Sequence, residues 1–168
     1  RNRRTICGVS RPWICSSVRC CSAFNVLSRE LGRGGMGVVF YAEHVVIQKP
    51  VAVKILKTSV MRDDTVVKRF IQEARAASRI GHPNIVDVTD SGRTDDGSVY
   101  FVMEYLEGDT LRKYCRKEHL LPLDRCAEIV FKICNALDYA HQKGVIHRDI
   151  KPSNIMLDDK GEPKLMDF

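Results

Sequence analysis

The stretch VIHRDIKPSNIML, residues 145–157, places charged and polar side chains between two apolar segments. Asp149 and Asn154 are separated by four residues, and Lys151 lies between them. In phosphoryl transfer, a carboxylate and an amide at this spacing can serve a hydroxyl nucleophile and a metal ion, respectively. A polar loop with solvated charges is the simpler alternative. The density and spacing of the side chains favour a phosphoryl-transfer site.

A further carboxylate, Asp167, follows Asn154 by thirteen residues and comes directly after a short apolar segment. An aspartate that ends a buried strand can bridge a metal ion to phosphate groups, because hard cations prefer oxygen ligands. Asn154 and Asp167 are therefore the candidate metal ligands.

Glycines in the segment LGRGGMGVV, residues 31–39, fit the pattern G-x-G-x-x-G. Glycine lets backbone N–H groups approach a polyphosphate closely. The pattern alone is weak, because an ordinary glycine-rich hairpin satisfies it too. A dinucleotide-binding motif requires a helix directly after the glycines, whereas residues 38–46 have a strand-like sequence. The dinucleotide interpretation is therefore excluded.

Lys54 lies in the apolar segment VAVKIL, residues 51–56, where it shares a strand face with Ala52. Such a lysine is usually an edge residue or extends to water. Glu73, however, falls on the apolar arc of a helix predicted over residues 63–80, and a buried carboxylate is costly without a partner. We therefore expect Lys54 and Glu73 to pair, with the ammonium group directed at a phosphate.

The elements that must position these residues fall into two groups. Residues 25–60 and 84–106 contain β-branched and aromatic runs that predict strands, and residues 63–80 form a helix with Asp63 as a candidate N-cap. Five strands and one helix predict a compact α+β unit that ends near Leu106. The sequence beyond it is mainly helical, and its longer helix is predicted to face inward through Ile129, Ile133, Leu137 and Ala140.

The net charge of +6 is concentrated at one end of the chain. Residues 1–24 hold five arginines and no acidic residue, which leaves 22 basic and 21 acidic residues, a net +1, in the remainder. This distribution argues against nucleic-acid binding. We interpret residues 1–24 as a basic, cysteine-rich tail that is disordered or spurious. No apolar run approaches the ~18 residues that a membrane span needs.

Taken together, these motifs resemble those of the protein kinase family, specifically the Ser/Thr kinases, and most of all the bacterial kinases of the eukaryotic-like (Hanks) type. The pattern G-x-G-x-x-G-x-V runs from Gly32 to Val39, and V-A-I-K appears as residues 51–54. H-R-D-x-x-x-x-N runs from His147 to Asn154, and Asp167 and Phe168 match the first two residues of D-F-G. A chance match of four ordered motifs is improbable, at well under ~1%.

The resemblance implies a two-lobed α+β fold. Residues 25–106 would form the N-lobe, a five-stranded antiparallel sheet with one helix, and residues 107–168 would form part of a mainly helical C-lobe. The D-F-G glycine and the activation loop would follow Phe168. We expect the isolated chain to be inactive and poorly stable, because the packing partners of the helix around residues 129–140 are expected mostly beyond Phe168.

The resemblance also assigns roles to individual residues. The glycine loop and Lys54, held by Glu73, would bind the ATP phosphates, and the backbone of Glu104 and of Leu106 would meet the adenine edge. Asp149 would orient the substrate hydroxyl, and Lys151 would neutralise the transferring phosphoryl group. The other ATP-binding residues would be Leu31, Gly32, Gly34, Gly35, Gly37, Val39, Ala52, Met103 and Met156.

Asn154 and Asp167 would hold Mg²⁺, or Mn²⁺ in its place. His147 and Phe168 would stack in a hydrophobic column that links the lobes, and Arg148 would bind a phosphate on the activation loop.

The resulting hypothesis is an ATP-dependent kinase that phosphorylates Ser/Thr hydroxyls of protein substrates. The alternative is a pseudokinase or signalling module that binds nucleotide without turnover; the filled catalytic positions favour the enzyme. We expect a cytoplasmic kinase portion, and a membrane anchor elsewhere in a longer parent protein remains open.

Overall fold

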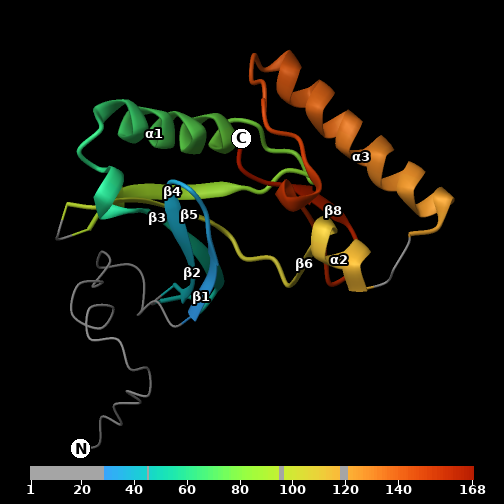
Figure 1. Ribbon diagram of the computed structural model, residues 1–168, viewed down its shortest axis with the longest axis horizontal. Coiled ribbons are helices and arrows are strands. Elements are labelled where there is room, and N and C mark those ends of the chain that lie inside the picture. The colour runs from blue at the N-terminus through green and yellow to red at the C-terminus, as the bar shows by residue number, and fades with distance from the viewer. Residues whose placement is uncertain (1–28, 45, 95–96, 118–120) are drawn as a thin grey trace, which may run out of the picture.

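The computed structural model describes residues 29–44, 46–94, 97–117 and 121–168. The tail inferred for residues 1–24 lies outside the described residues. Two sheets and three α-helices make up the described structure, with α1 beside the larger sheet and α3 at the opposite end (Figure 1). Among the described residues, no helix has the length and apolar character that crossing a membrane would require.

The larger sheet has five antiparallel strands in the order β1-β2-β3-β5-β4, which confirms the predicted N-lobe sheet. The register pairs Val39 with Lys54, and Ala52 with Met103. Since directly paired residues share a face, these four side chains lie on the same face of the sheet. The strands are β1 (Arg29–Arg33), β2 (Gly37–Glu43), β3 (Pro50–Leu56), β4 (Val88–Arg93) and β5 (Val99–Glu104).

Helix α1 (Asp64–Ser78) follows a short 3₁₀ turn, η1 (Thr58–Val60). Asp63 is its N-cap, as predicted, and its side chain accepts hydrogen bonds from the backbone N–H groups of the first turn. The buried face of the helix, which includes Phe70 and Ala77, packs with Leu56 and Phe101 of the sheet. This packing places α1 on the same sheet face as Lys54.

The second sheet is small and has the order β6-β7-β8. Gly108 is required where β6 meets β7, because its φ is +157° and an added Cβ would lie 1.9 Å from the carbonyl oxygen of Leu157. The elements of this part are β6 (Gly108–Thr110), α2 (Leu111–Lys117), α3 (Leu123–Gln142), η2 (Pro152–Asn154), β7 (Ile155–Asp158) and β8 (Pro163–Leu165).

Helix α3 corrects one sequence-based expectation. Its predicted inward residues Ile129 and Ile133 are buried in a core that includes Ile80, Ile85 and Leu165. The packing partners of this face therefore lie within the chain, and the expectation that most of them lie beyond Phe168 is wrong. A different face of the helix is uncovered and exposes Leu123, Val130 and Phe131.

The segment after α1 connects the two sheets. The N–H of Leu165 donates to the carbonyl oxygen of Asn84 at 2.8 Å, and the N–H of Val86 donates to that of Leu165 at 2.9 Å. Ile85 and Leu165 thus form a parallel bridge between this segment and β8. Because Asp167 follows β8 by two residues, the bridge fixes its position relative to the larger sheet.

Candidate active site

Helix α1 and the segment after β8 both contact the side chain of Lys54, which lies on β3. Its Nζ lies 2.7 Å from Oε1 of Glu73 on α1 and 2.8 Å from Oδ1 of Asp167, which follows β8. The Lys54–Glu73 pair is the one expected from the sequence, and its two side chains are 11% and 13% exposed. We call Lys54, Glu73 and Asp167 the lysine cluster.

One ammonium group serves two carboxylates in the lysine cluster. Burial opposes the charge on Lys54, but the charges of Asp167 and Glu73 outweigh it and raise its pKa, so the side chain stays protonated. Burial raises the pKa of the Glu73 carboxyl, and the ammonium group of Lys54 only partly offsets this effect. The cluster carries one excess negative charge, which favours a nearby cation.

The second set of functional side chains lies in the loop before η2 and in η2 itself. The amide nitrogen of Asn154 donates to the backbone oxygen of Asp149 at 2.9 Å and to its Oδ2 at 3.1 Å. The ammonium group of Lys151 forms an ion pair with the same carboxylate. We call Asp149, Lys151 and Asn154 the aspartate loop. Asn154 is buried, whereas Asp149 and Lys151 are exposed.

The hydrogen bond from Lys151, with a further bond from Asn154, lowers the pKa of the Asp149 carboxyl below its ordinary value. A carboxylate with a lowered pKa is a weak base. At neutral pH such a carboxylate can accept a hydrogen bond from a hydroxyl group.

His147 connects the aspartate loop to the residues around Asp167. The backbone N–H of Asp149 donates to Nδ1 of His147, so the ring proton of His147 is on Nε2. This Nε2 lies 2.8 Å from the carbonyl oxygen of Met166. The ring of Phe168 lies 4.7 Å from that of His147 between centroids and packs against cores on both sides. The two rings are in contact but tilted, with an interplanar angle of 59°.

The backbone is strained beside His147 and beside Met166, the two residues joined by this hydrogen bond. Arg148 and Asp167 have φ angles of +65° and +61°, a left-handed conformation that is uncommon for residues other than glycine. Such conformations cluster at functional sites, where the surrounding structure holds them. The side chain of Arg148 is exposed.

The donor set fits a hard cation. The N–H of Met166 donates to the carbonyl oxygen of Asn154 at 2.9 Å, which brings Asn154 beside the segment that carries Asp167. Since the amide nitrogen of Asn154 faces Asp149, its Oδ1 remains as a ligand atom. No group of three or more His, Cys, Asp or Glu side chains suited to a metal occurs within the described part of the chain. Mg²⁺ commonly uses one or two carboxylates together with substrate phosphates.

The remaining predicted nucleotide-binding residues lie on the larger sheet, in the turn after β1 and in the segment from β5 to β7. Val39, Ala52 and Met103 share the Lys54 face of the larger sheet. Leu106 lies between β5 and β6, and Met156 lies on β7. Leu31 and Gly32 lie on β1, Gly34 and Gly35 lie in the turn after it, Gly37 begins β2, and Glu104 ends β5.

Two lysines near the site make contacts that the sequence does not predict. Lys164 on β8 binds both carboxylate oxygens of Glu104, at 2.8 and 2.9 Å, and so ties the end of β5 to the strand before Asp167. Lys57, the residue directly after β3, binds the carbonyl oxygens of Gly34 and Gly35 in the glycine loop. The sequence predicts a role only for the backbone of Glu104, as a partner of adenine. The spacing of residues along the chain predicts neither lysine contact.

Comparisons with known proteins identify the family of the chain. The sequence profile of the protein kinase domain matches residues 25–168. The chain is 42% identical over 142 residues to the serine/threonine-protein kinase pkn3 of Myxococcus xanthus, covering 82% of this chain and 26% of that protein. It is 42% identical over 140 residues to the serine/threonine-protein kinase PrkC of Bacillus subtilis, covering 83% of this chain and 22% of that protein.

A solved structure gives the same result. The crystal structure of the Mycobacterium tuberculosis PknI kinase domain matches with a TM-score of 0.75 and 33% identity, covering 88% of this chain and 58% of that one. The chain thus spans about a quarter of the length of these curated relatives. With a matching profile over most of its length, relatives that are bacterial Ser/Thr kinases, and a shared fold, the chain belongs to the protein kinase family.

Proposed function

We propose that this domain binds Mg·ATP and, within a longer protein, transfers the γ-phosphoryl group to Ser/Thr hydroxyls of a protein substrate. The observation that carries the proposal is the lysine cluster. It holds a charged ammonium group between α1 and the end of β8, on the face of the sheet below the glycine loop.

In this proposal, Lys54 binds the α- and β-phosphates. Its contact with Asp167 is replaced by a phosphate contact, which frees Asp167 for the metal, while Glu73 keeps the ammonium group in place. Asn154 and Asp167 hold Mg²⁺, or Mn²⁺ in its place, which neutralises charge on the phosphates when bound.

Asp149 orients the attacking hydroxyl, in keeping with its low basicity, and Lys151 stabilises the charge of the transferring group. Both side chains are exposed and accessible to a macromolecular substrate. Adenine would bind against Leu31, Val39, Ala52 and Met156, next to the backbone of Glu104 and of Leu106. These arrangements leave positioning and electrostatics as the main sources of rate acceleration.

The first test is a titration of chain 1–168 with Mg·ATP by calorimetry, with Lys54→Ala as the control that should lose affinity. The second is phosphoamino-acid analysis of the products of the full-length protein. Lys151 supports phosphoserine or phosphothreonine, because lysine at this position is typical of Ser/Thr kinases. Failure to bind nucleotide, or a dominant phosphotyrosine signal, would contradict the proposal.

The alternative is a module that binds nucleotide without turnover. The occupied positions of Asp149, Asn154 and Asp167 favour the enzyme over this alternative. We also propose that catalysis requires polypeptide beyond Phe168, and a kinase assay on purified chain 1–168 tests this point.

A further inference from the structure

Lys57 is the first residue after β3 and binds the glycine loop three times. Its Nζ donates to the carbonyl oxygens of Gly34 at 2.6 Å and of Gly35 at 3.2 Å. Its backbone N–H donates to the carbonyl oxygen of Met36 at 2.9 Å. Three consecutive carbonyl groups of the loop therefore point toward one residue.

This contact fixes the direction of the neighbouring N–H groups. The described residues contain no cis peptide bond. In a planar trans peptide, the C=O of one residue and the N–H of the next point in opposite directions. Since the carbonyls of Gly34 and Gly35 face Lys57, the N–H groups of Gly35 and Met36 point away from it. Within the described part of the chain, neither of these N–H groups donates a hydrogen bond.

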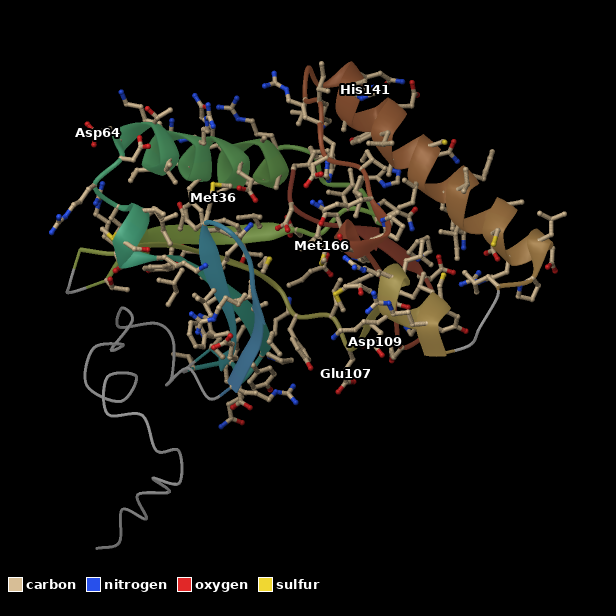
Figure 2. The ribbon with its side chains drawn as sticks, in the orientation of Figure 1. Met36, Asp64, Glu107, Asp109, His141 and Met166 are labelled. Atoms are coloured by element: carbon tan, nitrogen blue, oxygen red, sulfur yellow. The ribbon has the colours of Figure 1, made fainter. Side chains whose placement is uncertain are left out.

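The side toward which these N–H groups point is the side of Lys54. Lys57 continues the β2–β3 ladder past the pair of Gly37 and Leu56. Side chains three positions apart on an extended segment leave opposite faces, so Lys57 and Lys54 lie on opposite faces. Figure 2 labels Met36 at the tip of the β1–β2 turn.

The position of the tip indicates which part of a nucleotide it would meet. Gly37 pairs with Leu56 at one end of β3, whereas Val51 pairs with Glu104 at the other end. Val51 and Leu56 are five residue steps apart on β3, which corresponds to ~16 Å of extended strand. A base bound beside Glu104 therefore leaves its phosphates, not its ring, near the tip.

We propose that Lys57 is a positioning residue that holds the Gly34 and Gly35 carbonyls and so orients the next two N–H groups as a polyphosphate site. The proposal rests on the nucleotide binding proposed above. Two adjacent N–H groups that point the same way form an anion-binding concavity. Glycine adopts positive and negative φ with similar ease, so without Lys57 these peptides would rotate and lose that alignment.

The test compares ligands with and without phosphates on chain 1–168. Affinities for Mg·ADP and for adenosine are measured by calorimetry for the wild type, Lys57→Met, Lys57→Arg and Lys49→Met. Methionine is one atom shorter, so it keeps most of the apolar side chain but removes the donor. Lys49→Met removes the same charge from the exposed β2–β3 turn and is the matched control.

We expect Lys57→Met to weaken Mg·ADP binding about fivefold or more, as loss of a charged hydrogen bond does, and to change adenosine binding less than about twofold. Lys57→Arg, which keeps the donors, should retain most of the Mg·ADP affinity. An equal loss for adenosine and Mg·ADP, an unchanged Mg·ADP affinity, or an equal effect of Lys49→Met would overturn the proposal.

A second measurement tests, without nucleotide, whether Lys57 orders the glycine loop. Backbone ¹⁵N order parameters of Gly35 and Met36 should fall in Lys57→Met and stay at wild-type values in Lys49→Met. If the wild type binds no nucleotide, the proposed function fails, while these order parameters still test whether Lys57 orders the loop. Unchanged values in Lys57→Met would refute the positioning role.

Discussion

The lysine cluster and the aspartate loop use the same kinds of side chain but are assembled in opposite ways. Lys54 is joined to partners 19 and 113 residues away in sequence, and its pair with Glu73 is largely withdrawn from water. The members of the aspartate loop lie within six residues, and the side chains of Lys151 and Asp149 are 49% and 58% exposed.

This difference suggests a division of labour between the two groups. A mostly buried charge that Glu73 holds in place reorganises little, which suits a small ligand that must be held in one position. Exposed charges on one loop cost little to maintain and stay accessible, which suits a macromolecular substrate. The comparison predicts that the two groups respond differently to the same kind of substitution.

The largest effect is expected at the lysine cluster. Lys54→Ala in the full-length protein should reduce turnover by on the order of 10²- to 10³-fold, because a preorganised charge is lost. Affinity for Mg·ATP should fall as well, and paired kinase and binding assays measure both quantities. Near-wild-type phosphorylation would remove the basis for assigning the phosphates to Lys54.

A smaller and more selective effect is expected at the aspartate loop. Asp149→Asn should reduce turnover by on the order of 10²-fold, since the hydroxyl loses its orienting carboxylate. Affinity for Mg·ATP should stay within about twofold of the wild type, because Asp149 is not expected to contact the nucleotide. A large loss of affinity with unchanged turnover would show that the role is misassigned.

The free energy of unfolding should also change more on substitution in the lysine cluster than on substitution in the aspartate loop. Lys54→Met leaves the mostly buried Glu73 without its cation and should lower the free energy of unfolding by about 1–3 kcal/mol. Lys151→Met breaks an exposed pair and should change it by less than about 0.5 kcal/mol. Urea denaturation of chain 1–168 measures both values. Equal effects would mean that burial does not distinguish the two pairs.

The smallest effect concerns proton binding. Glu73 should titrate above its ordinary value of 4.5, and Asp149 below its ordinary value of 3.8. The lowered pKa of Asp149 contributes stability above about pH 3.8, which is lost as the pH falls through the folded-state value. The raised pKa of Glu73 has the opposite sign: it lowers stability above the folded-state pKa, and this loss is relieved as the pH falls from that value toward 4.5. Carboxyl ¹³C NMR titration measures which of the two residues has the higher pKa. A higher pKa for Asp149 than for Glu73 would contradict the assigned environments.

Much of the fold could be predicted because it depends on local patterns. The strand alternation, the Asp63 cap and the inward face of α3 all follow from residues that are close in sequence. The extent of packing could not be predicted in the same way. The partners of Ile129 and Ile133 include Ile80 and Ile85. No periodicity within α3 identifies these partners, which precede Ile129 by more than forty residues.

The sequence by itself determined the aspartate loop, because spacing along a short loop limits how far apart Asp149, Lys151 and Asn154 can lie. It also determined that Glu73 needs a cation, since a carboxylate on an apolar helix face must be paired. Only the tertiary structure decided that Lys54 is shared between Glu73 and Asp167, and that Lys57 holds the glycine loop. These contacts depend on strand register and on the docking of β8 against the segment after α1, and both arise from long-range packing.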